Sequence, residues 1–449
     1  MTVTVTYPGV YVEEDSSTSL SVISSPTAVP IFIAVDMYDD QGHLFPSYEC
    51  IRINNYLEFV NLSIIHWTNV SVSILSGDGS SGDPYTVSIS YVPVNGTHCF
   101  LQLRNYFANG GGYCYVLPVS GDDLAEPEIA GSRLVSEIQK YSDVTLISVV
   151  ALNTERSAVV YPLLTPLLVS GSLYFMITDA DEEGQPTSAA PAYSAAYYPT
   201  IEIRADGTRP PDTAITVVSR DDNGDNTVTT LAEMGGDNEV AYWDISNQID
   251  RDFLTLSFPM PASSTMAGVY CATDRQRGVW SAPANVAIEG ILGISAPVSN
   301  AVAGALNDTG VNVFRYVNKR GYIVAGARTV DGTATNTDLS WRYIQVRRLF
   351  NSAESDIKRA MRTLVFEPNN APTWEKARSA IDNYLYALWQ EGALVGAKHE
   401  DAYFVQIGKD VTMTDDDIAA GKMIATVGMA AVRPAEFIIL QFTQDMMGS

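Results

Sequence analysis

The sequence is poor in the residues that metal sites, disulfide frameworks and acid–base catalysis require. Its 449 residues include only four cysteines and four histidines. The cysteines, Cys50, Cys99, Cys114 and Cys271, are far apart and form none of the close pairs typical of zinc sites. None of the histidines stands in an HExxH, HxH or HRD pattern. We therefore expect reduced, mostly buried thiols, no metal ion and no cofactor.

Basic side chains are also scarce, with 27 lysines and arginines against 52 aspartates and glutamates, which gives a net charge of −25. Such a chain repels phosphate backbones and anionic lipid surfaces, so nucleic acid and membranes are not expected partners. No run approaches the roughly 18 apolar residues of a membrane span. The start, MTVTVTYPGVYVEED, lacks the basic and apolar regions of a signal peptide, so none is expected.

The remaining composition is ordinary for a folded protein of more than one domain, because single cores rarely grow past about 250–300 residues. Four continuous apolar runs of strand length indicate strands buried on both faces of a sheet. A segment with helical character, 131–141, lies between two of them, which is typical of βαβ units around a mainly parallel sheet. A turn-rich stretch, 76–84, predicts a hairpin. The runs are 28–35, 113–119, 144–151 and 172–178.

Residues 201–257 differ in character, with turn sequences such as RPPDT, DDNGDN and MGGDN between short β-like runs. This pattern predicts a small, acidic, β-rich insertion at the surface. Residues 221–226 (DDNGDN) could ligate calcium, but they lack the order of an EF-hand loop and are better interpreted as a solvated hairpin turn.

The last third of the chain combines helices and strands. Residues 341–362 are rich in helix formers, and Thr373 is expected to cap a helix that ends at Gly392. Thr414 should cap a short acidic turn. Residues 422–432 and 436–443 then read as two strands.

The first twelve residues have strand propensity but polar flanks. Two short strand-like pieces surround Tyr7-Pro8-Gly9, and an acidic tract begins at Glu13. A segment of this kind either pairs with its own sheet or supplies an edge strand to another subunit.

Two fragments invite a catalytic interpretation. Residues 263–268 (SSTMAG) echo the segment around a subtilisin nucleophile, but Thr265 occupies the serine position and no histidine has a matching context. Residues 109–112 (NGGG) follow a helical segment, the reverse of the order that cradles phosphates, so they predict a helix stop. We therefore expect no enzymatic activity and keep a subtilisin-like hydrolase only as a remote alternative.

Basic residues are concentrated in 341–378, a segment that contains eight basic and only four acidic side chains. The cluster is either a solvated helix face or a docking surface for an acidic partner, including other copies of the chain. The eight are Arg342, Arg347, Arg348, Lys358, Arg359, Arg362, Lys376 and Arg378.

Ten short segments stand in a fixed order along the whole chain: 7–14 (YPGVYVEE), 105–116 (NYFANGGGYCYV), 195–199 (AAYYP), 267–270 (AGVY), 277–285 (RGVWSAPAN), 326–329 (GART), 341–344 (WRYI), 346–349 (VRRL), 366–369 (FEPN) and 433–438 (RPAEFI). Together they resemble the contractile tail sheath family of phages, pyocins and extracellular injection particles. Their order, rather than any single motif, makes the resemblance specific. The chain departs from the family at Thr200 and Ala325, where tryptophan is frequent, and 200–259 is longer than in minimal sheaths.

Together the patterns and the resemblance predict an α/β and α+β multi-domain fold. It comprises a mainly parallel-sheet α/β core, a small β-rich surface insertion and an α+β C-terminal domain. The expected domains are an N-terminal strand-donating arm at 1–20, the core at 21–200 and 258–335, the outward-facing insertion at 201–257, and the inner domain at 336–449 with its C-terminal arm from about 433.

The resemblance implies that both arms add strands to the C-terminal domains of neighbouring subunits and keep the copies linked while the lattice rearranges. The implied arm residues are Thr2, Val3, Thr4, Val5, Tyr7, Val10, Tyr11, Val12, Glu436, Phe437, Ile438, Ile439, Leu440 and Phe442. The eight basic residues named above would face the tube.

The implied function is that of a structural subunit that polymerises helically around an inner tube and contracts, with energy stored in the extended lattice. Expected partners are further copies in stacked hexameric rings, the tube protein, baseplate and terminator proteins, and sister sheath proteins. Assembly is expected in the bacterial cytoplasm, into a phage tail or a released extracellular particle. The alternative is an accessory surface or adhesin component of such a particle, with 201–257 as its binding segment.

Overall fold

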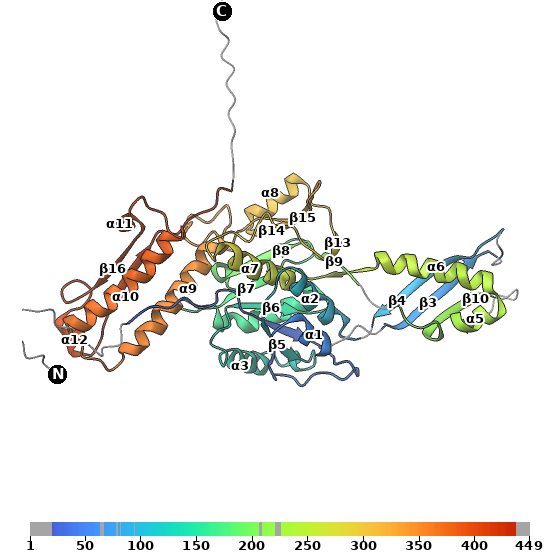
Figure 1. The fold of residues 1–449 in the computed structure, drawn as a ribbon, viewed down its shortest axis with the longest axis horizontal. Coiled ribbons are helices and arrows are strands. Elements are labelled where there is room, and N and C mark those ends of the chain that lie inside the picture. The colour runs from blue at the N-terminus through green and yellow to red at the C-terminus, as the bar shows by residue number, and fades with distance from the viewer. Residues whose placement is uncertain are drawn as a thin grey trace, which may run out of the picture. The chain divides into compact units, whose positions relative to one another are not determined.

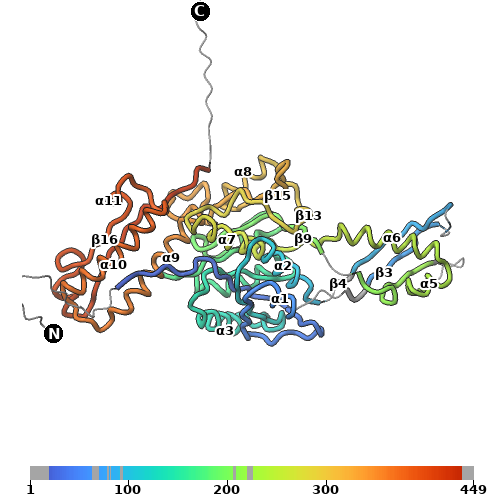
Figure 2. The backbone as a smooth tube through the Cα atoms, viewed as in Figure 1, coloured from blue at the N-terminus to red at the C-terminus, as the bar shows by residue number. Residues whose placement is uncertain are grey.

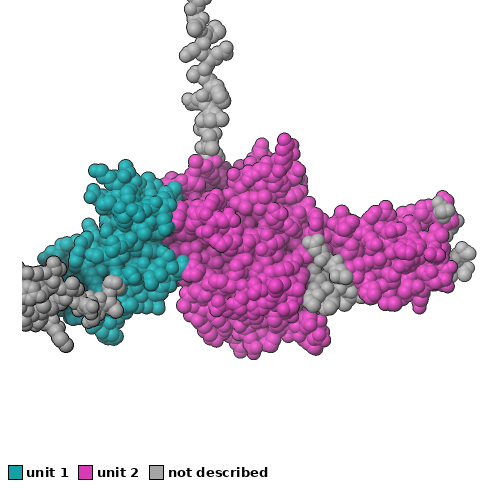
Figure 3. Space-filling view, in the orientation of Figure 1, with its two compact units in different colours: residues 1–25, 353–432 teal, residues 26–352, 433–449 magenta. Residues whose placement is uncertain are grey.

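The computed structural model describes residues 20–62, 67–77, 80, 82–93, 95–205, 209–220 and 226–436. The chain divides into two compact units (Figure 3). The central unit comprises Pro26–Ser352 with Arg433–Ser449, and the C-terminal unit comprises Met1–Ser25 with Ala353–Val432. The C-terminal domain was expected to begin at 336, whereas the contacts assign 336–352 to the central unit.

The central unit is built on an eight-stranded sheet with the order β15-β14-β8-β7-β6-β1-β5-β2 (Figure 1). Neighbouring strands from β5 to β14 are parallel, and β2 and β15 run antiparallel at the two edges. The four apolar runs of the sequence form β1, β5, β6 and β7, which confirms the expected mainly parallel sheet. The strands are β1 Pro30–Val35, β2 Ile51–Ile53, β5 Cys114–Val119, β6 Leu146–Val150, β7 Phe175–Asp179, β8 Ser194–Tyr198, β14 Val311–Val317 and β15 Gly321–Ala325.

Strand β1 is buried on both faces because apolar cores form on both sides of the sheet. Phe32 belongs to a core that includes residues of α2 and α7, and Ile33 belongs to a second core that includes residues of α3. Helices α2 and α7 pack closely, since a Cβ atom on Gly268 would lie 2.3 Å from the Tyr106 carbonyl oxygen. The helices of this part are α1 Tyr56–Leu62, α2 Thr97–Ala108, α3 Pro127–Ile138, α4 Thr154–Val160, α7 Ser263–Arg277 and α8 Asn300–Asp308.

A separate four-stranded sheet, β11-β10-β3-β4, carries its own small core with α5 and α6. The expected hairpin around 76–84 is β3 paired with β4, and β3 also pairs with β10 from the 201–257 segment. Short strands were expected throughout 201–257, but 231–255 is helical. The elements are β3 Trp67–Ser76, β4 Thr86–Pro93, β10 Ile215–Arg220, β11 Asn226–Thr230, α5 Leu231–Asp237 and α6 Glu239–Thr255. A third sheet joins β12 Ser257–Met260, β9 Ile201–Arg204 and β13 Ile291–Ile294.

In the C-terminal unit, two long helices accompany a two-stranded antiparallel sheet, β16-β17. The boundary between the units falls within α9. The acidic turn is capped by Thr414 as expected, through a reciprocal capping box with Asp417. The elements are α9 Ile344–Met361, α10 Ala371–Gln390, α11 His399–Ala402, β16 Tyr403–Ile407, α12 Asp415–Ala419 and β17 Ala425–Met429.

Helix α10 begins three residues earlier than the sequence analysis expected. Asn370, not Thr373, is its N-cap, with an extended backbone and a side chain that accepts a 3.3 Å hydrogen bond from the Thr373 amide. Pro372 follows in the first turn, where its missing N–H costs nothing. Of the expected strand at 436–443, only Glu436 lies within the described residues, and the N-terminal arm at 2–12 lies outside them.

Candidate assembly sites

Arg348 was expected on a docking surface, but the structure places it inside the central unit. Its guanidinium donates two hydrogen bonds to the Asp274 carboxylate, at 2.9 and 2.7 Å, and a third to the Thr27 carbonyl at 3.0 Å. The two side chains of the ion pair are 3% and 5% exposed. Burial disfavours the arginine charge, but Asp274 outweighs burial and raises the pKa of Arg348 above its usual value. Arg348 therefore has an internal role.

Arg347 is also buried, at 3% exposure. Its guanidinium lies 3.8 Å from the ring centre of Trp341 and 5.0 Å from that of Tyr193, and its Nε donates to Asn351 at 2.7 Å. The expectation that Arg347 and Arg348 form part of an exposed surface is wrong. Counting charges along a helix does not reveal which face is buried.

The other members of the basic cluster are more accessible. Arg342 is half-buried, whereas five lie exposed: Lys358, Arg359, Arg362, Lys376 and Arg378. Arg359 pairs with Asp356 at 2.9 Å. Arg378 pairs with Glu375 one helical turn away on α10. We refer to the five exposed residues as the basic surface of the C-terminal unit.

Phe366 is an exposed apolar residue of the C-terminal unit that the sequence analysis quoted only within a motif. Its side chain is fully exposed, and its neighbour Val365 is 59% exposed. The Phe366 backbone has φ of 74°, a left-handed conformation that is strained for a large side chain. The Phe366 side chain therefore buries no surface against the described part of its own chain.

Asp356 organises the start of the described chain within the C-terminal unit. Its carboxylate accepts hydrogen bonds from the Ser25 amide at 3.2 Å and from the Tyr384 hydroxyl at 3.0 Å. Burial, reinforced by the nearby Asp356 charge, raises the pKa of Tyr384. Residues 23–27 lie alongside α9 (Figure 2), and Arg359 on this helix also donates a hydrogen bond to the Ile23 carbonyl at 2.8 Å. The segment that follows the N-terminal arm is thus fastened to the fold.

Glu436 was expected to be the first residue of a donated strand, but it is bonded to its own central unit. Arg328 Nε and Nη2 donate to its two carboxylate oxygens, both at 2.8 Å. Asn307 Nδ2 and the Tyr343 hydroxyl each donate to it at 3.2 Å. Burial alone would raise the pKa of Glu436, but these bonds, led by Arg328, hold it below its usual value.

Three segments that carry the family resemblance meet at this ion pair. Arg328 comes from 326–329, Tyr343 from 341–344 and Glu436 from 433–438. Their sequence positions gave no indication that they are neighbours. The arginine of the motif at 326–329 was the available signal, but neither its burial nor its partner could be identified without the fold.

The fragment that echoed a subtilisin nucleophile is part of the core. Ser263, Ser264 and Thr265 are completely buried at the start of α7. Ser263 donates to the Val149 carbonyl, and Thr265 accepts from Asn105. These hydroxyls are therefore structural.

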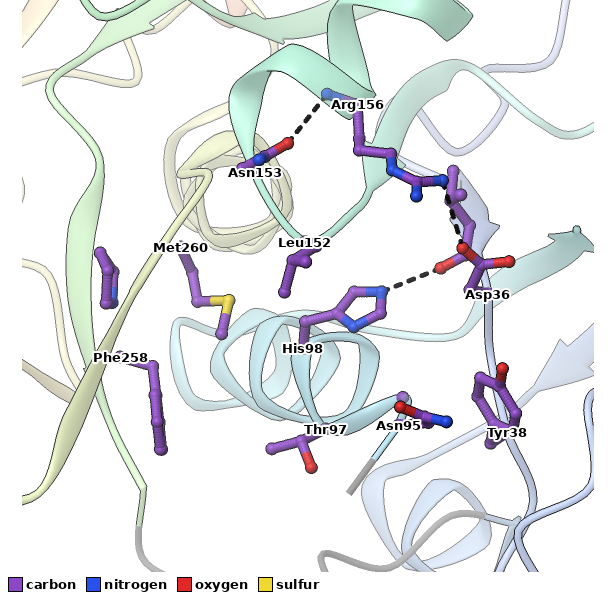
Figure 4. Close-up of a pocket in the computed structure, with 13 residues that line it drawn as sticks. Asp36, Tyr38, Asn95, Thr97, His98, Leu152, Asn153, Arg156, Phe258 and Met260 are labelled. Atoms are coloured by element: carbon purple, nitrogen blue, oxygen red, sulfur yellow. Dashed lines mark hydrogen bonds and ion pairs between the residues drawn. The ribbon is translucent and has the colours of Figure 1, made fainter. Parts of the chain in front are cut away.

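A hollow near the carboxyl ends of β1 and β6 occupies the place where α/β sheets commonly bind ligands. Its polar groups interact with one another (Figure 4): Arg156 lies 3.5 Å from Asp36, and His98 Nε2 donates to the Val35 carbonyl at 2.9 Å. Burial lowers the pKa of His98 and so favours the neutral form of its ring. This arrangement provides no nucleophile–base pair.

Chemical sites of other kinds receive no support from the described part of the chain. Within it, no group of three or more histidine, cysteine or acidic side chains could hold a metal ion. No helix in the same ranges is long and apolar enough to cross a bilayer. The four cysteines are free, and three of them are buried.

Solved sheath structures are similar to the chain along nearly its whole length. The helical sheath of the anti-feeding prophage (AFP) in the contracted state is 36% identical, with 98% of this chain and 100% of that chain covered and a TM-score of 0.70. The sheath complex of PVC, an extracellular contractile injection system, in the contracted state is 36% identical, with 99% of each chain covered and a TM-score of 0.66.

Family models agree with these structures. The phage tail sheath protein central domain matches residues 208–330, and the phage tail sheath C-terminal domain matches 336–445. The chain belongs to the contractile tail sheath family. Members of this family are structural proteins rather than enzymes, and the mixed α/β fold matches the solved sheaths.

Curated sheath proteins are more distant in sequence. The tail sheath protein of Enterobacteria phage T4 is 26% identical over 232 residues, which cover 51% of this chain and 32% of the phage protein. A putative prophage major tail sheath protein of Pseudomonas aeruginosa is 23% identical over 253 residues, which cover 55% of this chain and 61% of that protein. The chain thus spans about a third of the T4 sheath protein and less than two thirds of the other.

Proposed function

We propose that the chain is a sheath subunit that polymerises helically around an inner tube and contracts to drive the tube through a target envelope. The observation that carries this proposal is the similarity, through both units, to the AFP and PVC sheaths in the contracted state. A match to an isolated module would be compatible with many particle components. A match along 98–99% of the chain favours the sheath itself.

Neighbouring copies are linked by their terminal arms in this proposal. The described part of the β16–β17 sheet has only two strands, and two-stranded sheets are marginally stable alone. Phe404 on β16 is 50% exposed. Strands donated from residues 2–12 and 437–443 of other copies would extend this sheet and cover such side chains.

Contraction needs no nucleotide in this mechanism. Backbone ladders between copies can persist while the folded units change their packing, because a ladder fixes strand pairing and not domain orientation. The extended lattice then stores free energy that the repacking releases.

The basic surface of the C-terminal unit, with Phe366, is proposed to contact the tube protein through acidic side chains of that protein. Charge complementarity favours correct encounter, and an apolar anchor limits dissociation. Baseplate association is supported by the similarity to a chain of the AFP baseplate, 37% identical with 99% of this chain covered and a TM-score of 0.67. We propose that the subunits form stacked hexameric rings. Terminator and sister sheath proteins are further proposed partners. Assembly is proposed to take place in the bacterial cytoplasm, before the particle is released.

Negative-stain electron microscopy of the purified chain, over a range of salt and protein concentration, tests the proposal. We expect hollow helical tubes of uniform width. Chains that stay monomeric even when the tube protein is added would contradict it and would favour an accessory surface component.

A further inference from the structure

We propose that Arg328 and Glu436 form a latch that fixes the point where the C-terminal arm leaves its own subunit, and so sets the arm's reach toward a neighbouring copy. The inference rests on the proposed arm function and adds a positioning role for two residues within it. Glu436 is the last described residue, and 437–449 follow it directly.

The geometry and burial of the Arg328–Glu436 pair suit it to fix the position of a chain segment. Arg328 binds both carboxylate oxygens of Glu436 at 2.8 Å, a bidentate geometry that fixes direction as well as distance. The side chains are 6% and 20% exposed, so water competes little for the bonds. Screening by salt is correspondingly weak.

Arg328 is itself held rigidly. Its Nη1 donates to the Asn307 carbonyl at 2.8 Å, and its amide donates to Asn312 Oδ1 at 2.8 Å. Asn312 is fully buried within β14 and also donates to the Arg328 carbonyl. The glutamate therefore meets a preorganised site on the central sheet rather than a mobile side chain.

The position of the latch determines where the proposed arm begins. An extended strand rises about 3.3 Å per residue, so a donated strand at 437–443 would end about 23 Å from Glu436. Release of the latch would move the starting point of the arm back to 433 and add about 13 Å. A longer tether lowers the effective concentration of the arm at its acceptor and loosens the spacing between copies.

The test compares Glu436→Gln with the wild-type chain. Glu183→Gln, at an exposed glutamate of the same unit, is the matched control. The Val432 amide, which donates to the Ala393 carbonyl just before the latch, should exchange at least tenfold faster in the Glu436→Gln monomer. The protein concentration needed for tube formation should rise about 1.5- to 2-fold, which is the change that the −3/2 power law gives when four residues lengthen a tether of about ten. The control should match wild type in both measurements.

A second variant separates positioning from stability. Gly-Ser-Gly-Ser inserted after Glu436 keeps the latch and lengthens the free arm. It should retain wild-type thermal unfolding and wild-type exchange of the Val432 amide. It should nevertheless need a higher concentration for tube formation, as Glu436→Gln does. If Glu436→Gln does not fold, this variant alone tests whether the length of chain beyond the latch controls tube formation.

The latch is overturned if Glu436→Gln forms tubes at the wild-type concentration, or if the insertion does so. Different results would contradict the proposed sheath and arm functions on which the latch rests. A wild-type chain that forms no tubes would contradict the sheath assignment, and tubes formed by a chain lacking 437–449 would contradict the arm function.

Discussion

Arginine side chains in this protein act in different ways, and burial distinguishes them. Arg348 and Arg328 make bidentate pairs within the central unit, whereas Arg378 pairs with Glu375 on the surface of α10. A surface pair is screened by water and costs little to break. Breaking a buried pair leaves an unpaired charge in a poorly solvated site.

Replacing Arg348 by Met should therefore destabilise the protein by about 3–5 kcal/mol, because Asp274 would remain buried without its partner. Arg378→Met should cost at most about 1 kcal/mol. Urea unfolding of the monomeric variants would measure both changes. Equal losses of unfolding free energy in the two variants would show that burial does not determine how much the Arg348 ion pair contributes to stability.

Helix α10 illustrates how closely an element's start can be predicted. Asn370, Pro372 and Thr373 are all helix start signals, and the predicted N-cap was Thr373, whereas the observed N-cap is Asn370. The proline belongs in the first turn, so the cap must precede it. This local signal would have identified Asn370 without the fold.

Asn370→Ala should lower the stability of the C-terminal unit by about 1 kcal/mol, since the first amides of α10 lose their acceptor. Thr373→Ala should have a smaller effect, because its amide is the donor in this cap. Fluorescence of Trp374, which donates to Asn369 at 2.7 Å, can follow denaturant unfolding of this unit. A larger loss with Thr373→Ala would contradict the assignment of the cap.

For the whole molecule, assembly should depend on segments that the folded monomer does not need. A chain lacking residues 1–14 should give a monomer with the wild-type circular dichroism spectrum, because the fold is fastened from Ile23 onward by Arg359 and Asp356. It should form no tubes, because the donated strand is missing. Long tubes from the truncated chain would refute the arm model.

The basic surface should matter only for contact with the tube. Reversing Lys358, Arg362 and Lys376 to glutamate should weaken co-assembly with the tube protein at least tenfold without lowering the melting temperature. The same number of reversals at exposed residues elsewhere, Lys140, Arg251 and Lys319, should leave co-assembly unchanged. Cosedimentation with the tube protein would measure co-assembly of both triple variants. An equal loss of co-assembly in the two variants would mean that total charge, and not the basic surface, determines binding.

The sequence by itself predicted the elements whose signals are local. Apolar runs such as the one that forms β1 are buried on both faces wherever a parallel sheet lies between helices. The capping box at Thr414 involves residues three apart. The ordered motifs also indicated the family, since they are spread over the whole chain.

Only the tertiary structure decided which distant segments meet. The hairpin at 76–84, which was predicted within the core domain, belongs to the separate four-stranded sheet because β3 pairs with β10. Burial of one face of α9 removed Arg347 and Arg348 from the predicted surface, and Arg328 found its partner in Glu436. Charge and periodicity describe each segment alone, whereas these pairings depend on residues brought together by folding, so no local pattern could specify them.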